Sequence, residues 1–565
     1  QSGDLDNAAR IYKELLDAKP KSEELLKAVI RTYSKQNRFS ELAVIIEKHL
    51  PVHESPWLLT TYAEINWRTG NNKKANELWE KVLEDYAKRP EVYEMVAGSQ
   101  TNVRQLEKAI ETLERGRDEL DNELLFSSDL SKLYVAVGNY EDGVDEILNL
   151  FYAGKDLALA QGQIYALMAD EEANEYIGRR LKQETDKNPD HILLQSLYSF
   201  YLRTVGDYDK ALDVAVKLDE MTNSKGRRIL AFADQSRGDG QYGIAMRAYE
   251  EIINMGRDSR FLANALYGYA RSLEQKILEQ NTITEEQAGK IIDRYRMIIK
   301  EFPRELNAAE SRYRIAYIAK NYLNDIDMAE EELKNLIENH GYQRITAKAT
   351  NELGEIYLMQ DYPEKAKQTF KRVIDKFCKI SPDDCRQAQY NTAELFYFRG
   401  ELDTAQKQFA ELSKFSDSDI ANNALDRIVH LETNKQFNEA LKIFAQAELR
   451  EFQMRYDDAV DLFNKVAEYA PQGNFREQSL LRIARIEKKR GNPAEADKIL
   501  TSIIESNEET IFADNILIML GDIQTELGNK EKATEYFKKI LVKYPRSIYA
   551  QQAREKIRIL RGENI

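Results

Sequence analysis

The sequence predicts an all-α fold, a right-handed α-solenoid of about fifteen helix-turn-helix repeats. Proline and glycine are scarce, with 11 and 25 residues in a chain of 565, which favours long helical content. A short glycine-centred turn recurs, for example in RTGNNKKA, AVGNYEDG and TVGDYDKA. A small or apolar residue also follows these turns at a spacing of 33 or 34 residues, at Ala8, Leu42, Ala75, Ala109, Gly143, Ile177, Ala211 and Ala245.

Each part of this repeated unit has a physical reason. Glycine can adopt the left-handed conformation that ends the first helix of a pair. The Asn or Asp that follows it can cap the free amide groups of the second helix. The small residue of the second helix then lets the two helices approach closely, so a bulky side chain at that position should overpack the pair.

The spacing becomes longer and less regular after residue 257. The segment 272–290 lengthens one unit, and the recurring positions then lie mostly 35 to 39 residues apart, at Ile291, Ala329, Ala366, Ala405, Ala440, Ala496 and Ala533. Ala459 fits the pattern too, which predicts that the helix around Ala440 is the second helix of one unit and the first of the next. We therefore expect two subarrays, 1–260 and 261–565, without a flexible linker and with a capping helix at the C-terminal end.

Residues 520–545, LGDIQTELGNKEKATEYFKKILVKYP, combine an L-G pair, an A-x3-F pair (Ala533 and Phe537) and a closing Pro545. This segment resembles the tetratricopeptide repeat, and the resemblance implies an α-solenoid that serves protein–protein interaction. The second subarray repeatedly ends its second helices with an aromatic-Pro or aromatic-Cys step. In this it resembles tetratricopeptide proteins of the bacterial cell envelope, such as the TolA-binding protein and outer-membrane assembly lipoproteins. That resemblance implies the periplasm, with the cytoplasm as the alternative.

Charge and hydropathy narrow the classes of partner. The formal net charge is −15 and the isoelectric point is about 5.2, which argues against binding to nucleic acid or to anionic lipid. No apolar run approaches the roughly 20 residues of a transmembrane helix, so we expect no direct membrane insertion. The expected partners are proteins, either a peptide segment or a subunit of a complex, and the oligomeric state is left open.

The chain has two cysteines, Cys378 and Cys385, on either side of a Ser-Pro-Asp-Asp turn between two predicted helices. A disulfide between them is geometrically possible and would indicate an oxidising compartment. The alternative is two unrelated thiols, because free cysteine is a common small buried residue. The sequence leaves both open.

No motif in the sequence favours catalysis, a cofactor or a metal. GDGQYG at 238–243 matches G-x-G-x-x-G, but a helical run precedes it and the repeat places an ordinary turn there. His49 and His53 have the spacing of a metal pair, but Pro51 lies between them and predicts an interrupted helix. The many carboxylates lie on amphipathic, charge-mixed segments, where exposure to solvent is the simpler interpretation. The sequence therefore predicts that the chain is not an enzyme.

Candidate binding residues occupy first-helix positions that face the inner groove in tetratricopeptide proteins. Trp57 and Trp67, with Glu64 and Arg68 beside them, could form a binding patch, since aromatic residues and arginine often anchor interfaces. The alternative is that both tryptophans are buried against the neighbouring repeat, as we expect for Trp79 in its own hairpin. Comparable positions of a later repeat are occupied by Gln387, Tyr390, Glu394 and Tyr397.

Two hypotheses of function remain open at this point. In the first, the chain is a non-catalytic scaffold or adaptor subunit of a bacterial cell-envelope assembly. In the second, it is an interaction appendage of a larger chain or of a cytoplasmic complex, whose enzymatic or sensor module lies outside these residues. The first residues, QSGDLDNAARIYKELLDAKP, resemble the second half of a repeat. We therefore expect that Gln1 is not an initiator and that a helix, a leader or a further domain precedes it.

Overall fold

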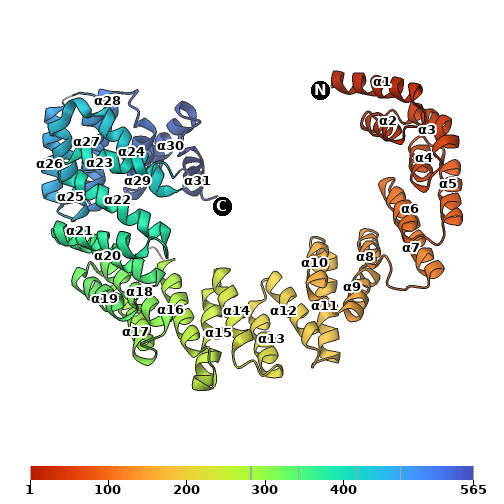
Figure 1. The fold of residues 1–565 in the computed structure, drawn as a ribbon, viewed down its shortest axis with the longest axis horizontal. Helices are drawn as coiled ribbons and strands as arrows, with labels where there is room; N and C mark the ends of the chain where they lie inside the picture. Colours follow the sequence, from red (N-terminus) through yellow and green to blue (C-terminus); the bar gives the residue numbers. More distant parts are fainter. Residues whose placement is uncertain (1, 280–282, 342, 416–417, 471, 564–565) are drawn as a thin grey trace. The chain divides into compact units, whose positions relative to one another are not determined.

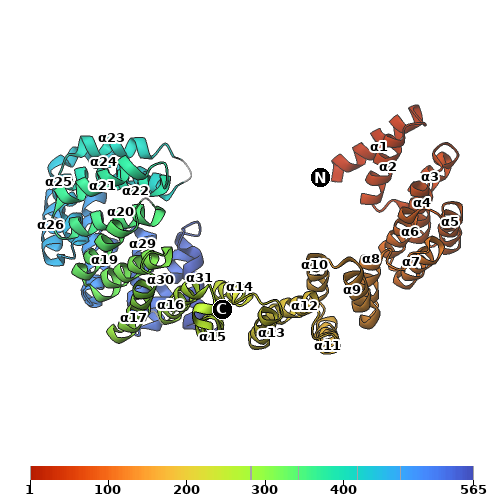
Figure 2. The same cartoon turned by 60° about the horizontal axis from the view of Figure 1, so that its bottom comes forward.

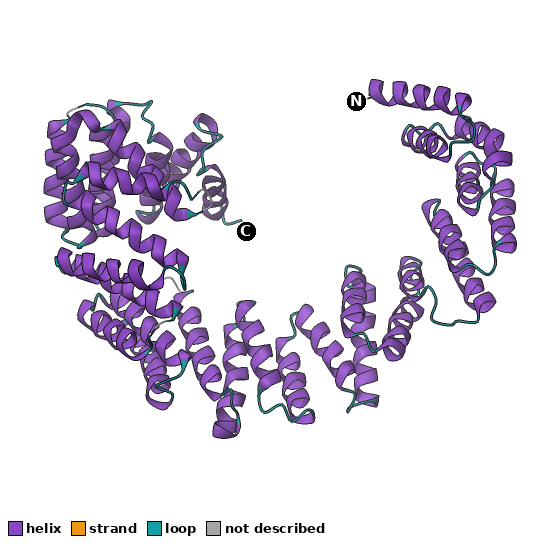
Figure 3. Cartoon of the chain, viewed as in Figure 1, coloured by secondary structure: helices purple, strands orange, loops and turns teal. Residues whose placement is uncertain are grey.

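A computed structural model describes residues 2–279, 283–341, 343–415, 418–470 and 472–563. Within these ranges the regular elements are helices joined by short loops, and there is no strand (Figure 3). The chain divides into two compact units, unit 1 (Gln1–Ser272) and unit 2 (Leu273–Ile565). The boundary lies inside a helix, slightly beyond the position predicted between residues 260 and 261.

Unit 1 is a stack of antiparallel hairpins that follow one another in chain order (Figures 1 and 2). Its helices are α1 (Ser2–Ala18), α2 (Glu23–Lys35), α3 (Phe39–His53), α4 (Pro56–Arg68), α5 (Asn72–Asp85), α6 (Pro90–Asn102), α7 (Leu106–Leu120), α8 (Ser127–Ala136), α9 (Tyr140–Gly154), α10 (Leu157–Leu167), α11 (Glu171–Lys187), α12 (Ile192–Thr204), α13 (Tyr208–Met221), α14 (Arg227–Gly238), α15 (Tyr242–Met255), the 3-10 turn η1 (Gly256–Asp258) and α16 (Leu262–Leu278), which crosses into unit 2.

Unit 2 continues the hairpins with longer and less regular helices. They are α17 (Glu285–Glu301), α18 (Leu306–Ile318), the π-helical turn η2 (Ala319–Leu323), α19 (Ile326–Asn339), α20 (Arg344–Met359), α21 (Pro363–Phe377), α22 (Pro382–Phe398), α23 (Leu402–Leu412), α24 (Asp419–Thr433), the 3-10 turn η3 (Lys435–Phe437), α25 (Asn438–Phe452), α26 (Tyr456–Tyr469), α27 (Asn474–Lys489), α28 (Pro493–Ser506), α29 (Ala513–Glu526), α30 (Lys530–Lys543) and α31 (Ala550–Leu560).

The turns follow the predicted chemistry. Gly70, Gly138 and Gly206 end first helices with φ of +84°, +80° and +83°, the left-handed region in which glycine is favoured. Asn139 and Asp207 come next and cap the second helices, because their side-chain oxygens accept the amides of the third residue that follows each. The hairpin corners are therefore encoded locally.

The recurring small or apolar residues lie where the two helices of a hairpin meet. Leu42, Ala75, Ala109, Ile177, Ala211 and Ala245 have no exposed surface. The first unit is the exception, since α1 buries Ala9 and Leu16 in place of Ala8 and Leu15. The predicted register of that helix was wrong by one residue, which leaves Leu15 exposed.

Unit 2 departs from strict repetition at two places. In the predicted insertion 272–290, α16 and α17 are both long, and residues 280–282 lie outside the described ranges. At the second place, α24 is inserted between the α22–α23 hairpin and the next one. The helix that contains Ala440, α25, pairs with α26 and also packs on α22. It is therefore the first helix of one hairpin, and its predicted role as the second helix of a preceding hairpin was wrong because α24 supplies the extra helix.

Pro51 does not interrupt α3, contrary to the prediction. It lies inside the last turn of the helix, which continues to His53. Proline removes one amide donor, and so close to the end of the helix that loss affects a single turn. The rings of His49 and His53 lie 6.4 Å apart, and His53 Nε2 is 2.7 Å from the carbonyl oxygen of Pro20.

Among the described residues, no helix combines the length and apolar character that crossing a membrane requires.

Candidate interaction surface

Three first helices of unit 2 and the inserted α24 carry a row of alternating charges, which we call the ladder: Glu394 on α22, Arg427 on α24, Glu448 on α25 and Arg482 on α27. The guanidinium of Arg427 donates to both carboxylate oxygens of Glu394, at 2.7 and 2.8 Å. It also donates to Glu448 at 2.6 Å, and Arg482 donates to the other oxygen of Glu448. Each pair joins different helices, so the ladder connects three consecutive hairpins and α24 by charge-assisted hydrogen bonds.

Burial makes the ladder electrostatically strong. Burial opposes ionisation of Glu448, but Arg427 and Arg482 outweigh it and lower the pKa of this carboxyl to about 2. Burial raises the pKa of Glu394, which has Arg427 as its only basic partner in the ladder. The ladder is therefore a partly desolvated charge network and not a set of surface ion pairs.

Tyr397 and His430 fill the space beneath the ladder. Tyr397 has no exposed surface, and the Arg427 guanidinium lies 4.5 Å above its ring. Its hydroxyl is 3.4 Å from His430 Nε2, and burial lowers the pKa of His430 to about 4. Tyr397 is thus a core residue, and its assignment to an accessible groove was wrong because the next repeat covers it.

The other predicted residues of this repeat are less buried. Tyr390 packs against Phe409, with ring centres 5.4 Å apart, and is half-buried. Gln387 donates to Asn391 at 2.8 Å and borders an open cavity of about 660 Å³ between α20, α22 and α24. Glu394 belongs to the ladder. The structure therefore places these three near the first-helix surface but gives them different roles.

Two cavities lie along the ladder. Cavity A has a volume of about 570 Å³ and is lined by Lys320, Asn321, Met359, Glu394, Phe398, Arg427, Glu448, Glu451, Phe452, Met454, Tyr456, Arg482 and Lys489. Cavity B has a volume of about 400 Å³ and is lined by Glu448, Gln478, Leu481, Arg482, Arg485, Ile511, Phe512, Asp514, Asn515, Ile548 and Tyr549. Glu448 and Arg482 border both, so the two cavities form one continuous first-helix surface.

A contact between residues that are far apart in the sequence closes one end of cavity A. The side-chain amide of Gln453, after α25, donates to the carbonyl oxygen of Leu358 at 2.9 Å and to Asp361 at 3.1 Å. Arg450 lies 3.4 Å from the same aspartate. This contact joins the turn after α20 to the turn after α25, and α24 is part of the intervening segment. It holds Met359 and Met454 in the wall of the cavity.

Cavity B combines a cation with exposed apolar side chains. Arg485 donates to Asn515 at 3.1 Å, and in the described part of unit 2 no carboxylate forms an ion pair with it. Burial and the neighbouring Arg482 lower the pKa of Arg485. Ile511 and Ile548, at the edge of the cavity, are 68% and 86% exposed. Exposed apolar groups beside an uncompensated arginine are typical of an interface.

In unit 1 the structure separates the two candidate tryptophans. Trp57 is half-buried, and the ammonium group of Lys27 on α2 lies 5.1 Å from its ring centre. The Trp67 ring lies 5.7 Å from Trp79 of α5 and 5.9 Å from Lys108 of α7. Trp67 therefore packs toward second helices, but it is half-buried like Trp57, and its groove role also stays a prediction. Trp57 lies between neighbouring first helices, and its groove role stays a prediction.

Glu64 and Arg68 form a surface pair that bridges two hairpins. Arg68 donates to Glu64 at 2.8 Å and to the carbonyl oxygen of Asn102 on α6 at 3.1 Å. The Asn102 amide donates to the other Glu64 oxygen at 3.2 Å. These contacts use much of the hydrogen-bonding capacity of both side chains, so the pair fixes the α4–α6 packing.

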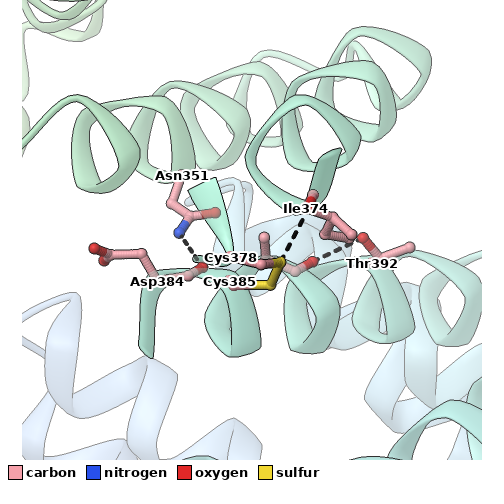
Figure 4. The surroundings of a disulfide bond; sticks show 7 residues. Asn351, Ile374, Cys378, Asp384, Cys385 and Thr392 are labelled. Atoms are coloured by element: carbon pink, nitrogen blue, oxygen red, sulfur yellow. Dashed lines mark hydrogen bonds between the residues drawn. A yellow bond between two sulfur atoms is a disulfide. The ribbon is translucent and has the colours of Figure 1, made fainter. Parts of the chain in front are cut away.

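The structure joins Cys378 and Cys385 in a disulfide, with Cα atoms 4.9 Å apart (Figure 4). The bond links the end of α21 to the first turn of α22. Beside it, the amide of Asn351 on α20 donates to the carbonyl oxygen of Asp384 at 2.7 Å. Three successive helices are therefore fastened at one corner.

The remaining sequence motifs have structural roles. Gly240 of the GDGQYG motif has a φ of +76° in the turn between α14 and α15, so this motif is an ordinary repeat turn. In the part of the chain that the structure describes, no group of three or more His, Cys, Asp or Glu residues could hold a metal.

The hairpins and the charged first-helix surface define a helical-repeat solenoid of the interaction-scaffold type. A family model described as tetratricopeptide repeat matches residues 478–509 and 516–547, which comprise α27–α28 and α29–α30. The second match includes residues 520–545, the segment that first indicated this repeat. The curated proteins give no match.

Solved structures give distant likenesses. The structure of Naa15/Naa10 bound to HypK-THB is 13% identical, with a TM-score of 0.31, over 99% of this chain and 94% of that one. A tetratricopeptide repeat protein from Parabacteroides merdae is 12% identical, with a TM-score of 0.26, over 60% of this chain and 99% of that one. Since these scores are low, we base no functional argument on them.

Proposed function

We propose that the chain is a non-catalytic protein–protein interaction scaffold, and that the first-helix surface of unit 2 holds a segment of its partner. The observation that carries the proposal is the continuity of cavities A and B along the buried ladder. The tetratricopeptide repeats at residues 478–509 and 516–547 lie in the same unit and support an interaction role.

The ladder would reduce the entropy cost of binding a partner. Arg427 and Arg482 are held by carboxylates of neighbouring helices, so the walls of both cavities are ordered before a partner arrives. Preorganised walls reduce the ordering that association requires. Ile511, Ile548 and Arg485 then supply the exposed apolar and cationic contacts at the edge of cavity B.

Photo-cross-linking in the native host tests this proposal. Benzoylphenylalanine would be placed at Ile511 or Ile548 at the edge of cavity B, and at Ile559 as the control. Ile559 is also exposed and lies on α31, but it does not line either cavity. We expect a discrete protein adduct from the probe at Ile511 or Ile548 and none from the probe at Ile559. We also expect Arg485→Ala to lower the yield of that adduct. The same products at all three positions would contradict the proposal.

We further propose that this scaffold is a subunit of a bacterial cell-envelope assembly. Two features support the proposal: the longer repeats of unit 2 with their aromatic-Pro ends, and the Cys378–Cys385 bridge, since disulfides persist in oxidising compartments. Counting free thiols on protein purified from its native host under alkylating conditions tests it. We expect none, and two reactive thiols would contradict an oxidising location.

The alternative is an interaction appendage of a larger chain or of a cytoplasmic complex, with an enzymatic or sensor module elsewhere. The tetratricopeptide repeats at residues 478–509 and 516–547 are equally compatible with this role. Sequencing of the complete precursor decides between the two. A secretion leader alone before Gln1 supports the envelope proposal, and a folded module there supports the appendage.

A further inference from the structure

Another cavity lies on the opposite, second-helix side of unit 2, and the proposed function does not use it. Cavity C has a volume of about 590 Å³, within the range of ligand pockets in proteins. It lies between the second helices α21 and α23, and α22 forms its floor. Its lining residues are Ile374, Gln389, Thr392, Lys407, Gln408, Glu411, Leu412, Lys414 and Phe415.

The interior of cavity C is mainly apolar. Ile374 and Leu412 come from the two facing second helices, and Phe415 closes one end with 49% of its surface exposed. An aromatic ring left this exposed at the mouth of an apolar cavity is available to pack against a large apolar side chain.

The disulfide fixes one wall of this cavity, α21, to its floor, α22. Ile374 lies one turn before Cys378 on α21, and Gln389 lies one turn after Cys385 on α22. Figure 4 shows Ile374 and Thr392 on one side of the bridge and Asn351 and Asp384 on the other. A covalent link therefore holds one wall and the floor of the cavity together, and packing places α23 as the other wall.

The rim of cavity C carries an excess of positive charge in an acidic protein. Lys414, just after the end of α23, is paired with Glu411 on that helix, at 2.7 Å. Lys407 is exposed, and the described residues give it no carboxylate partner. The lining therefore has two lysines and one glutamate, so an acidic group of a partner complements it.

We propose that cavity C is a second docking site, which binds an amphipathic helix of a partner protein. A helix fits because the groove between two neighbouring helices accepts the side-chain ridge of a third. The helix inserts a large apolar side chain against Ile374, Leu412 and Phe415. It places a carboxylate one turn away beside Lys407, since residues three or four apart share one face of a helix.

Two synthetic helical peptides test this site on the full chain, with fluorescence anisotropy as the measurement. Both carry leucine and phenylalanine on one face, and the flanking positions hold glutamate in one peptide and lysine in the other. We expect the acidic peptide to bind about tenfold more tightly, and we expect Lys407→Glu to reverse the preference. Lys538→Glu, an equal charge change at an exposed position on α30, should leave it unchanged.

A blocking variant separates this site from the first-helix surface. Gln408→Trp fills the cavity from a half-buried position and should abolish binding of the acidic peptide while the helical melting curve is retained. Binding that survives in Gln408→Trp, or that is lost in Arg485→Ala, places the peptide elsewhere and overturns the proposal. Equal affinity for the two peptides overturns it as well. None of these outcomes depends on whether cavity B binds its own partner.

Discussion

The two units build the same hairpins, but some of their first helices differ sharply in charge. In unit 1, α10 has no charged residue, and the only charged residue of α12 is Arg203 near its end. Leu159 and Tyr165 of α10 are exposed, Tyr165 by 64%. In unit 2, the equivalent helices α22, α25 and α27 carry buried members of the ladder.

This difference shows that the hairpin core and the first-helix surface are independent of each other. The small residues of the second helices and the glycine turns are alike in both units and hold the hairpins together. The outward positions of the first helices are then free to be neutral, as in α10, or charged, as in α27. Repeat proteins use this freedom to vary binding while the fold stays constant.

Glu448→Ala is the change with the largest expected effect on this comparison. It leaves Arg427 and Arg482 partly buried without their shared carboxylate, and breaking a buried charge network costs about 3–5 kcal/mol. All three tryptophans, Trp57, Trp67 and Trp79, lie in unit 1, so urea unfolding followed by tryptophan fluorescence reports that unit. We expect the far-UV circular dichroism transition to shift while the fluorescence transition stays in place.

The matched variant in unit 1 is Arg68→Ala, which breaks the more exposed pair with Glu64. Such pairs contribute about 0.2–1 kcal/mol, so the fluorescence transition should move little. A loss as large as that of Glu448→Ala would remove the distinction between the two units.

Acid should weaken unit 2 through His430 before it protonates Glu448 of the ladder. The pKa of His430 is about 4 in the folded chain and about 6.5 when unfolded, so the unfolded state binds the proton first. The stability from the neutral ring is complete above about pH 6.5 and is lost as the pH falls toward 4, by up to about 3 kcal/mol. Protonation of Glu448 lowers the stability only below about pH 4.5, since the pKa of this carboxyl is about 2 in the folded chain.

Urea unfolding at several pH values, followed by circular dichroism, measures this loss. His430→Phe keeps an aromatic ring beside Phe444 and Phe475 and removes the titrating group. The stability of the His430→Phe variant should therefore be nearly independent of pH between about pH 4.5 and pH 6.5. An unchanged slope in His430→Phe would assign the pH dependence to another group.

Local chemistry explains which features were predictable from the sequence. A turn glycine such as Gly138 and a contact residue such as Ala211 act within one hairpin, so their spacing predicted the fold. The environment of Tyr397 depends on Arg427 and His430 of the inserted α24, which changed the expected pairing. Its burial could not be predicted from its own repeat.

Part of the ladder did leave a signal in the sequence. Glu394 and Arg427 are 33 residues apart, and Glu448 and Arg482 are 34 apart, which is one repeat in each case. Opposite charges at the repeat spacing predict a bridge between neighbouring helices. The link between Arg427 and Glu448 has no such regularity, because α24 lies outside the hairpin pattern.

Removing the disulfide should have an intermediate effect that is confined to unit 2. A bridge that closes so short a loop contributes about 2 kcal/mol, mainly by restricting the unfolded chain. Cys378→Ser with Cys385→Ser should shift the circular dichroism transition and leave the tryptophan fluorescence of unit 1 unchanged. Adding a reductant to the native protein should reproduce that shift and should have no effect on the double variant. A shift on adding reductant to the native protein and also to the double variant would show that the reductant acts elsewhere.

A last comparison contrasts two helical glycines, one in each unit. A Cβ added to Gly98 on α6 meets nothing within 4 Å, whereas one added to Gly354 on α20 would lie 2.3 Å from the Phe370 ring. Gly98→Ala should therefore stabilise unit 1 by about 0.5–1 kcal/mol, because alanine restricts the unfolded backbone. Gly354→Ala should destabilise unit 2 by about 1–3 kcal/mol through overpacking. We expect Gly98→Ala to move the fluorescence transition to higher urea and Gly354→Ala to move the circular dichroism transition to lower urea. Shifts of both variants in the same direction would contradict this assignment of open space at Gly98 and close helix contact at Gly354.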